Sequence, residues 1–459
     1  MKTNNNGRHF VLFGPANAGK STILGYLQTL NYTEQQFASE ILKIQTKIGD
    51  KFRTDSLFTF FVDDSTDEYT KVSDMSDSVN DERISYGTSK YVHIRRFGNF
   101  CLIDTPGGTN YAAERYRGLS LAEIGIFVVE IQSLLNFNTE NFRLVNDFFT
   151  TWYIWKKTHG VGNSIILLTK YDLVNHKDDY EKAKENLLRI ICESQESIVI
   201  IPTSISCKER KDINITDNRK LDWYSGPSLI DAIKSKSANK KDLTQSQESL
   251  FMFYNKNRKI EGFGEVMLWK INSGILNIKD KVTIFPVKIG DCYDAIDASI
   301  KNLSDDIGNN IEEALPGSLV NLVFSKYVDK KGNPLSRKNF EFARTAVITG
   351  REDSDIIIGN RIELEINNND MNPNEENILN NVSDRRDVSI VWFGNLIHAQ
   401  IDQKEKKDKG YLLTIILKND FVGMLESQLS RNVVLQIDTN YSSSQIPTYK
   451  CFIRGVQKV

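Results

Sequence analysis

The 459-residue sequence has little of several features that mark particular classes of protein. Its five cysteines are scattered and lack C-x-x-C spacing, which argues against a disulfide framework and against a zinc site. Lysine and arginine number 58 against 60 aspartates and glutamates, so the net charge of −2 creates no general attraction for nucleic acid or anionic membranes. This balance is still compatible with a basic patch on one face.

Long apolar runs are also missing. No stretch approaches the roughly 20 apolar residues of a membrane-spanning helix, so we expect no membrane association. Residues 1–7 are polar and are not typical of a signal peptide. The scattered, odd-numbered cysteines suggest reduced thiols, and together these features predict a cytoplasmic protein. The chain is long enough for about three domains and, with 40% hydrophobic residues, can bury ordinary cores.

The most informative stretch is Gly14–Thr22, which reads G-x-x-x-x-G-K-S-T. It follows a strand-like run at Phe10–Phe13 and precedes a helix-like pattern at Ile23–Leu27, the context of a phosphate-binding loop. Glycines let backbone amides turn toward phosphate oxygens, and the helix N-terminus adds positive charge. The predicted nucleotide-binding residues of this loop are Gly14, Asn17, Ala18, Gly19, Lys20, Ser21 and Thr22.

Two side chains of this loop and one later motif predict the phosphate and metal chemistry. Lys20 is expected to reach the β- and γ-phosphates, and the Ser21 hydroxyl to ligate Mg²⁺. A D-T-P-G motif then ends a second strand-like run. D-x-x-G alone is common in turns, but in this order it predicts that Asp104 holds Mg²⁺, usually through water, and that the Gly107 N–H contacts the γ-phosphate.

A T-K-x-D motif at residues 169–172 is a variant of the guanine-reading N-K-x-D. Asp172 can accept hydrogen bonds from guanine N1–H and the 2-amino group, which adenine does not offer. Lys170 can pack its stem over the base, and Thr169 offers a hydroxyl where asparagine would tie loops together with an amide. Ser204, after the next strand, is the candidate for a contact behind the base; an ordinary strand-end turn is the alternative there.

Strand-like and helix-like patterns alternate through the first 235 residues, which predicts an α/β domain with a mainly parallel sheet. An amphipathic helix is expected at Glu34–Gly49, a mobile acidic loop at 63–82 and a polar linker at 237–245. From Leu250 the pattern shifts toward strand-like alternation. The asparagine-rich stretch Asn367–Asp387 is expected to be a disordered excursion between strands.

Taken together, these motifs resemble those of a known family of GTPases. The ordered nucleotide motifs and the segment Asp222–Ile233, D-W-Y-S-G-P-S-L-I-D-A-I, resemble the GTPase domain of elongation factor 1-alpha. The GTPase subunit of ATP sulfurylase and the release-factor and ribosome-rescue GTPases are similar there. The helix inserted after the phosphate loop also resembles this branch rather than elongation factor Tu. Arg83–Thr88 stands in place of the R-E-R-G-I-T switch segment, and this match implies that Thr88 ligates Mg²⁺ and contacts the γ-phosphate.

The resemblance extends to the later domains. Gly262–Leu268, Asp280–Pro286 and Glu313–Gly317 resemble the second-domain β-barrel, and strands between residues 345 and 453 resemble the third-domain barrel more weakly. We therefore expect a P-loop GTP-binding domain at 1–238, a β-barrel at 248–330 and a second β-barrel at 340–459. The implied catalytic residues are Lys20, Thr88 and Gly107, and the implied metal ligands are Ser21, Thr88 and Asp104.

Two positions depart from the family. Gly108 stands where the family has a histidine that positions the attacking water, and glycine has no side chain for that task. Asn17 stands where this branch usually has aspartate. The resulting G-x-x-N-x-G-K-S pattern resembles potassium-activated GTPases, in which that asparagine helps to hold a monovalent cation. The alternative is an asparagine that simply stabilises the loop.

The resemblance implies a GTP/GDP- and Mg²⁺-dependent switch with slow intrinsic GTP hydrolysis. Its family default is an elongation-factor-like carrier of aminoacyl-tRNA to the ribosome. One alternative is the regulatory GTPase subunit of a sulfate-activating complex, with a protein effector as partner. Another is a GTP-binding scaffold that no longer hydrolyses GTP. The sequence does not favour one macromolecular partner over the others.

Overall fold

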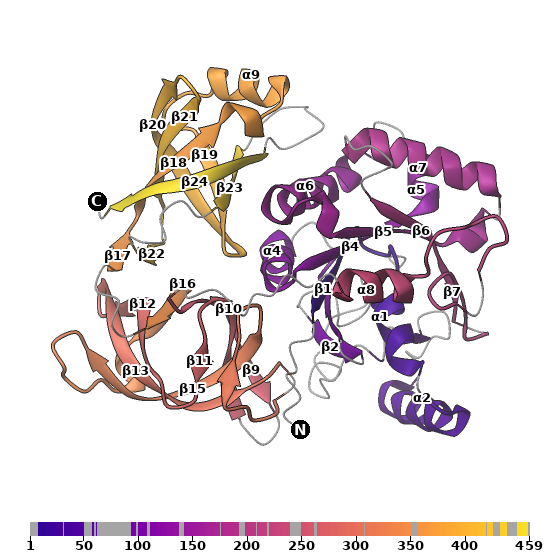
Figure 1. Ribbon diagram of the computed structural model, residues 1–459, viewed down its shortest axis with the longest axis horizontal. Helices are drawn as coiled ribbons and strands as arrows, with labels where there is room; N and C mark the ends of the chain where they lie inside the picture. Colours follow the sequence, from indigo (N-terminus) through magenta and orange to yellow (C-terminus); the bar gives the residue numbers. More distant parts are fainter. Residues whose placement is uncertain are drawn as a thin grey trace. The chain divides into compact units, whose positions relative to one another are not determined.

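Figure 1 shows the computed structural model of the chain. It describes residues 8–30, 32–49, 57–58, 61, 93–97, 100–107, 111–136, 142–174, 176–191, 198–207, 209–217, 220–238, 249–260, 264–306, 308–350, 356–418, 420–425, 432–437 and 448–457. The chain divides into two compact units, one containing residues 7–240 and the other residues 241–459. The expected loop at 63–82 lies outside the described residues, as does the expected linker beyond residue 238.

The first unit is built on a six-stranded sheet of order β2-β3-β1-β4-β5-β6. Its strands are β1 (His9–Phe13), β2 (His93–Phe97), β3 (Phe100–Asp104), β4 (Ile124–Glu130), β5 (Ser164–Thr169) and β6 (Val199–Pro202). Only the edge strand β2 runs antiparallel to its neighbour, and the other pairs are parallel. This confirms the mainly parallel sheet, whose carboxyl edge is where ligands bind in such folds.

Helices cover both faces of this sheet. They are α1 (Lys20–Thr29), α2 (Glu34–Ile48), α4 (Ala112–Leu121), α5 (Ile131–Leu135), α6 (Phe142–His159), α7 (Lys177–Ile191) and α8 (Leu229–Ala238). Leu24 of α1 and Ile233 of α8 share one core with Leu12 of β1. On the other face, Phe127 of β4 packs against Trp152 of α6, with ring centroids 5.4 Å apart. None of the described helices is long and apolar enough to cross a bilayer.

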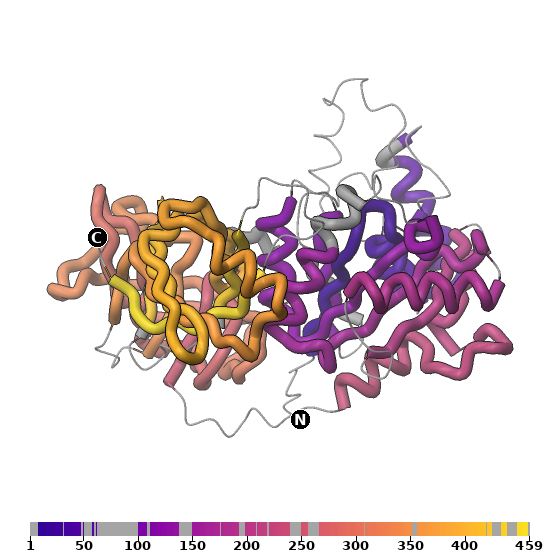
Figure 2. The backbone as a smooth tube through the Cα atoms, turned by 90° about the horizontal axis from the view of Figure 1, so that it is seen from above, coloured from indigo at the N-terminus to yellow at the C-terminus, as the bar shows by residue number. Residues whose placement is uncertain are grey.

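The helix α2 confirms the predicted insertion after the phosphate loop, and it lies at the periphery of this unit in both views (Figures 1 and 2). A capping box begins it: the Thr33 hydroxyl accepts a hydrogen bond from Gln36 N, and the Gln36 side chain accepts one from Thr33 N. These contacts satisfy amides that the helix itself leaves unpaired. Phe37 anchors the apolar face in the core.

The second unit contains two closed barrels. The first has the order β10-β15-β13-β12-β16-β9. Its strands are β9 (Phe251–Ile260), β10 (Gly264–Ser273), β12 (Lys281–Ile289), β13 (Cys292–Ser304), β15 (Leu319–Asp329) and β16 (Glu341–Gly350), with a short pair formed by β11 (Leu276–Asn277) and β14 (Glu313–Ala314). Alternate residues such as Val282 and Ile284 of β12 point into its core.

The strand β16 corrects the predicted domain division. The sequence interpretation assigned Thr345–Ile348 to the third domain, but β16 pairs with β12 and β9 and closes the first barrel. Without this strand, β9 and β12 would each present an unpaired edge, which closure of a barrel removes. The predicted boundary between residues 330 and 340 therefore divides one barrel.

The second barrel has the order β18-β21-β20-β19-β23-β24. Its strands are β18 (Arg361–Asn367), β19 (Asp387–Trp392), β20 (Asn395–Lys407), β21 (Gly410–Leu417), β23 (Asn432–Ile437) and β24 (Thr448–Gln457), and beside it β17 (Ile356–Gly359) pairs with β22 (Val422–Leu425). The two closed antiparallel barrels confirm the predicted fold class, an α/β P-loop domain followed by two β-barrels.

A further correction concerns the asparagine-rich segment, which is folded rather than disordered. It forms the helix α9 (Pro373–Asn381) between β18 and β19. Asn372 accepts a hydrogen bond from Glu375 N and its own N–H donates to the Glu375 carboxylate, each at 2.9 Å. Leu379 is buried in the barrel core. Capping and one buried anchor thus overcome a composition typical of disorder.

Candidate functional site

The phosphate loop connects β1 to α1 at the carboxyl edge of the sheet. Gly14 has φ +146°, and a Cβ there would lie 2.0 Å from the Val128 carbonyl oxygen of the adjacent strand β4. Gly19 has φ +96° and caps the N-terminus of α1. Any larger side chain at Gly14 would collide with the backbone, and one at Gly19 would be strained. The spacing of the two glycines therefore follows from the path of the loop.

Asn17 has its own conformational explanation. Its φ is +61°, in the left-handed region, and its side chain is exposed. Asparagine and aspartate adopt this region more readily than other side chains do. The backbone therefore accounts for a residue of this kind at position 17 without any cation. The neighbouring Ala18 is buried, with its N–H 3.4 Å from Pro15 O.

Lys20, the first residue of α1, folds back over the loop. It is only 5% exposed, and its Nζ donates hydrogen bonds to Gly14 O at 2.9 Å and Pro15 O at 2.7 Å. Burial lowers the pKa of this ammonium to about 8; the Asp104 carboxylate opposes the shift and Arg115 adds to it. Two carbonyl oxygens of the phosphate loop thus hold the ammonium at that loop, where a phosphate-binding cation is needed.

Ser21 and Asp104 form the candidate metal position. The Ser21 hydroxyl donates a 2.6 Å hydrogen bond to Asp104 Oδ2. Within the described part of the chain, the buried Asp104 Oδ1 has no hydrogen-bond partner. Burial raises the pKa of Asp104 to about 6 despite the opposing effects of Lys20, the Ser21 hydroxyl and the Thr105 N–H. A buried carboxylate oxygen without a partner, beside a hydroxyl, fits a hard oxygen-seeking cation such as Mg²⁺.

The loop after β3 passes directly over the phosphate loop. A Cβ on Gly107 would lie 2.7 Å from both Lys20 Nζ and Ala16 Cα, so only glycine fits there in this conformation. Thr105 ties the loop to β1: its Oγ1 donates to Leu12 O at 2.8 Å, and its N–H lies 3.2 Å from the same oxygen. Gly107 thus lies against the phosphate loop, and its contact with a γ-phosphate stays a prediction.

Thr169 joins the base-reading loop to the phosphate loop. Its hydroxyl oxygen lies 2.7 Å from Ala18 O and 3.2 Å from Val129 O, and the side chain is buried. A hydroxyl has one proton to donate, so the two carbonyls share it. Threonine therefore connects loops here, as asparagine was expected to do in the N-K-x-D form of the motif.

The remaining base-loop residues lie beside Thr169. Lys170 adopts φ +58°, and its Nζ pairs with Glu130 Oε2 at 2.9 Å. The Ser204 hydroxyl, at the start of β7 (Ser204–Ser206), donates to Asp172 Oδ1. Asp172 itself is exposed, in the short 3₁₀ turn Tyr171–Leu173. The structure thus brings together Asp172, proposed for the purine edge, and Ser204, proposed for a contact behind the base.

The W-Y-S-G-P segment packs against the base-reading loop and its neighbouring elements. The Trp223 ring lies 5.8 Å from that of Tyr171 and 5.1 Å from that of Tyr180 on α7. The Tyr224 hydroxyl donates to Ile200 O of β6 at 3.2 Å. Two neighbouring rings of the segment therefore fix the loop to a helix and a strand. The segment was noticed in the sequence as a resemblance, and the structure shows what it supports.

Some residues at the site were missed by sequence reasoning. Glu130, which pairs with Lys170, is the last residue of the apolar strand β4 and belongs to no motif. Arg115 is fully buried in α4, with its Nε donating to Thr151 Oγ1 at 3.1 Å, and its charge reaches Lys20. In the sequence, a charged residue within a predicted helix gives no indication that its side chain will be buried. Their positions depend on how strands and helices meet in three dimensions.

The predicted residues thus fall into two groups at the carboxyl edge of the sheet. The first group contains Gly14, Asn17, Ala18, Gly19, Lys20, Ser21, Thr22, Asp104 and Gly107, and the second contains Thr169, Lys170, Asp172 and Ser204. Thr88 and Gly108 lie outside the described residues, so their predicted roles stay predictions. A phosphate-binding end and a base-binding end are what a nucleotide requires.

Comparisons with known proteins agree with this geometry. The profile of the family described as the elongation factor Tu GTP binding domain matches residues 5–239. Elongation factor 1-alpha of Pyrobaculum aerophilum is 24% identical over 298 residues, covering 62% of this chain and 60% of that protein. The matched region thus spans less than two thirds of that relative's length.

Solved structures share the fold. The S. cerevisiae Ski7 GTPase-like domain, bound to GDP and inorganic phosphate, has a TM-score of 0.70 and 16% identity, covering 98% of each chain. Translation elongation factor SelB from Methanococcus maripaludis, in complex with the GTP analogue GppNHp, has a TM-score of 0.58 and 13% identity, covering 99% of this chain and 80% of that one. At this identity the likeness concerns the fold alone.

Proposed function

Since the chain belongs to the elongation factor Tu GTP-binding domain family, we propose that it is a guanine-nucleotide switch of the translation-factor type with slow intrinsic GTP hydrolysis. One observation carries the proposal: the Ser21–Asp104 pair and the close approach of Gly107 to Lys20 lie at the phosphate loop, and the Ser204–Asp172 pair lies at the base loop. The residues proposed to bind phosphate, metal and purine thus lie at one edge of one sheet.

Each residue group has a role in this proposal. The amides and Lys20 of the phosphate loop hold the phosphates, and Gly107 faces the γ-phosphate. Asp172 and Ser204 read guanine, while Thr169 and Lys170 order the base loop. Ser21, Asp104 and Thr88 would hold Mg²⁺, which when bound neutralises charge on the β- and γ-phosphates. Ordering of the loops around Thr88 and Gly107 by GTP, and their release with GDP, would provide the switch.

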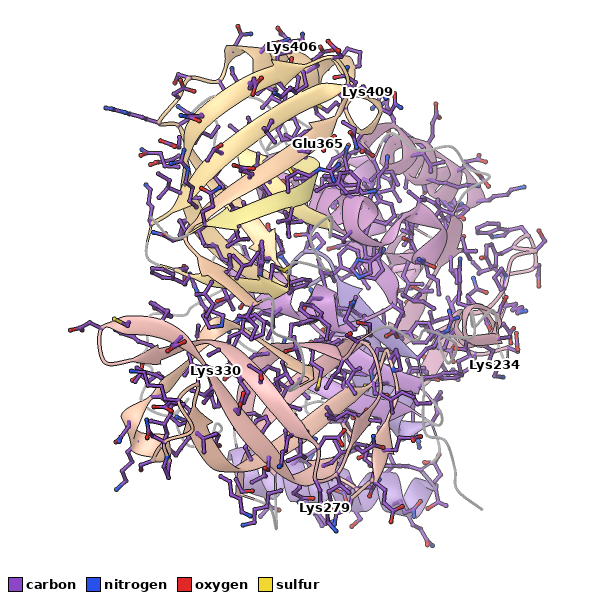
Figure 3. All side chains as sticks on the ribbon, turned by 60° about the vertical axis from the view of Figure 1, so that its left-hand side comes forward. Lys234, Lys279, Lys330, Glu365, Lys406 and Lys409 are labelled. Carbon is purple, nitrogen blue, oxygen red and sulfur yellow. The ribbon has the colours of Figure 1, made fainter. Side chains whose placement is uncertain are left out.

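We propose aminoacyl-tRNA delivery to the ribosome as the cellular role, on the relation to elongation factor 1-alpha. The lysine-rich hairpin of the second barrel, with Lys406 and Lys409 labelled in Figure 3, is one basic candidate surface. Ion pairs reduce its charge, because Lys406 lies 3.4 Å from Glu376 and Lys407 pairs with Glu405. Binding of tRNA by this hairpin is therefore expected to show only a shallow salt dependence.

A second candidate is a GTP-binding scaffold that does not hydrolyse GTP. Gly108 favours it, because a glycine cannot position the attacking water. No described contact favours a sulfate-activating complex. We propose a cytoplasmic location, on the relation to elongation factor 1-alpha.

The nucleotide proposal is tested by calorimetry with GTP, GDP and ATP in the presence of Mg²⁺. We expect binding of both guanine nucleotides, no comparable ATP binding, and weaker GTP binding by Lys20→Ala and Ser21→Ala with cooperative unfolding retained. Lys182→Ala, at an exposed position of α7, is a matched lysine control. Equal affinity for ATP and GTP, or normal GTP binding by Lys20→Ala, would contradict the proposal.

The carrier role is tested separately by binding of aminoacyl-tRNA to the chain loaded with a non-hydrolysable GTP analogue or with GDP. A carrier binds tRNA more tightly in the triphosphate form, because its loops are then ordered. Affinities measured over several salt concentrations report how many phosphates the protein neutralises. Equal tRNA binding in both nucleotide states would reject the carrier role and leave the nucleotide proposal intact.

A further inference from the structure

An ion pair joins two strand ends beside the base loop. Glu130 is the last residue of β4, and Lys170 follows the last residue of β5. The two strands are parallel neighbours in which Glu130 lies opposite Thr169, so both side chains emerge at the carboxyl edge of the sheet. Lys170 Nζ lies 2.9 Å from Glu130 Oε2, and the side chains are 36% and 27% exposed, respectively.

Lys170 is held at its backbone as well as at its ammonium. Its φ of +58° is unusual for a residue with a Cβ. On one side the Thr169 hydroxyl contacts Ala18 O and Val129 O, and on the other the Tyr171 N–H donates to Thr203 O at 3.1 Å. A free lysine side chain samples many rotamers, and fixing both ends removes most of that freedom. The stem of Lys170 is therefore restricted to a narrow path.

The Glu130 carboxylate is not used by its own helix. Glu130 occupies the N-cap position of α5, yet its side chain makes no capping hydrogen bond. Instead the Ser133 hydroxyl donates to the Glu130 carbonyl at 2.6 Å. The carboxylate reaches across to Lys170 instead. The Glu130 side chain therefore interacts with the base loop rather than with its own helix.

We propose that Glu130 is a positioning residue for the nucleotide base: it holds the Lys170 ammonium so that the lysine stem covers one face of the purine beside Asp172. This rests on the proposed guanine-nucleotide binding. Because the pair is neutral, Lys170 contributes packing on the base rather than attraction for phosphate. Loss of the carboxylate would release the ammonium and turn Lys170 into an unpaired cation near the nucleotide.

The proposal predicts that Glu130→Gln weakens binding of a ligand with a base but does not weaken binding of a ligand without one. In Glu130→Gln the stem is no longer held, so the Kd for GDP should rise about three- to fivefold, the upper range for a partly exposed ion pair. The same variant gains a free positive charge, so its Kd for inorganic tripolyphosphate, a ligand without a base, should stay unchanged or fall. A purely structural loss would weaken both ligands together.

The experiment is calorimetry of GDP and tripolyphosphate at fixed Mg²⁺ concentration on the full chain. Lys170→Met keeps the stem but removes the ammonium by which it is held, so it should raise the Kd for GDP about as much as Glu130→Gln does and should make Glu130→Gln silent in the double variant. Glu181→Gln, which breaks a comparable pair with Lys184 on α7 at 3.4 Å, should change neither Kd. Melting curves identify any variant that fails to fold.

The outcomes separate this inference from the function on which it rests. If the unmodified chain does not bind GDP, the proposed function fails and the inference falls with it. If the chain binds GDP and Glu130→Gln binds it equally well, the inference alone is wrong. Equal weakening of GDP and tripolyphosphate would also overturn it, as would an undiminished effect of Glu130→Gln in the Lys170→Met background.

Discussion

The Thr169 hydroxyl lies 2.7 Å from the Ala18 carbonyl oxygen and so connects two loops that are 151 residues apart in the chain. Ala18 belongs to the phosphate loop and Thr169 to the loop proposed to read the base. A displacement of either loop must therefore break this contact or be transmitted to the other. One buried side chain therefore links the phosphate loop to the loop proposed to read the base.

The change Thr169→Val removes this hydroxyl while keeping the shape of the side chain. We expect the free energy of unfolding to fall by about 1–3 kcal/mol, because buried carbonyls lose their donor. GDP should also dissociate faster, which the fluorescence of a labelled GDP measures. Thr169→Ser keeps the hydroxyl and should stay close to the unmodified protein. Thr46→Val, which removes a similar bond to Leu42 O on the exposed helix α2, should not change GDP dissociation. Equal dissociation rates for Thr169→Val and Thr169→Ser would refute the link.

A second prediction concerns the choice of base. In Asp172→Asn an amide donor faces the two donors of guanine, so preference should move from GTP toward XTP. Each charge-assisted hydrogen bond is worth about 1.5–3 kcal/mol, so the loss of GTP affinity should be roughly tenfold or more. Competition between GTP and XTP for a labelled nucleotide measures the change. Asp178→Asn, an exposed aspartate at the start of α7, is the matched control. An unchanged GTP-to-XTP ratio would show that Asp172 does not read the base.

A third prediction concerns α9, the helix that the sequence interpretation took for disorder. Leu379→Ala should lower the free energy of unfolding by about 2–5 kcal/mol, because Leu379 is completely buried in the second barrel. Ile378→Ala, on the adjacent, partly exposed position, should cost much less. Limited proteolysis should spare 373–381 in the unmodified protein and cut there in Leu379→Ala. Early cleavage of the unmodified helix would indicate that Leu379 does not anchor it.

The strand-end motifs could be predicted because they obey local rules. A glycine-spaced loop between a strand and a helix indicates its own geometry, and the φ values of Gly14 and Gly19 agree with it. The ends of parallel strands meet at one edge, so motifs far apart in the sequence could be placed together. Asp172 and Ser204 are the clearest case, since one predicted strand end was matched to another.

What could not be predicted depends on long-range pairing. The strand β16 looks like any other short strand until β9 and β12 are seen to need a partner between them. The ion pair of Glu130 with Lys170 can be inferred only once β4 and β5 are known to be neighbours. For α9 a local signal did exist, because Asn372, Pro373 and Glu375 form a capping sequence. The asparagine-rich composition outweighed it in the sequence interpretation.

The last prediction concerns turnover. Positioning and charge stabilisation are nearly all that phosphoryl transfer requires of a protein, and Gly108 cannot position water. We expect intrinsic GTP hydrolysis on the order of 10⁻³ s⁻¹ or below, the range of an unassisted small GTPase. Release of phosphate from GTP by the isolated chain measures this rate. Gly108→His should raise it if the loop can place the new side chain beside the γ-phosphate.

Asn17 allows the potassium hypothesis to be tested without disturbing the loop. Its φ of +61° suits aspartate as well as asparagine, so Asn17→Asp changes the chemistry of the side chain and keeps the backbone. Turnover is compared in potassium and in sodium at equal ionic strength. A fixed potassium ion near the β/γ bridge would offset developing charge, so stimulation by potassium that disappears in Asn17→Asp would support it. Identical rates in both salts would reject the ion and leave a partner-activated or non-hydrolysing switch. Rapid turnover without potassium would instead refute the prediction of slow hydrolysis, because another residue would then be positioning the water.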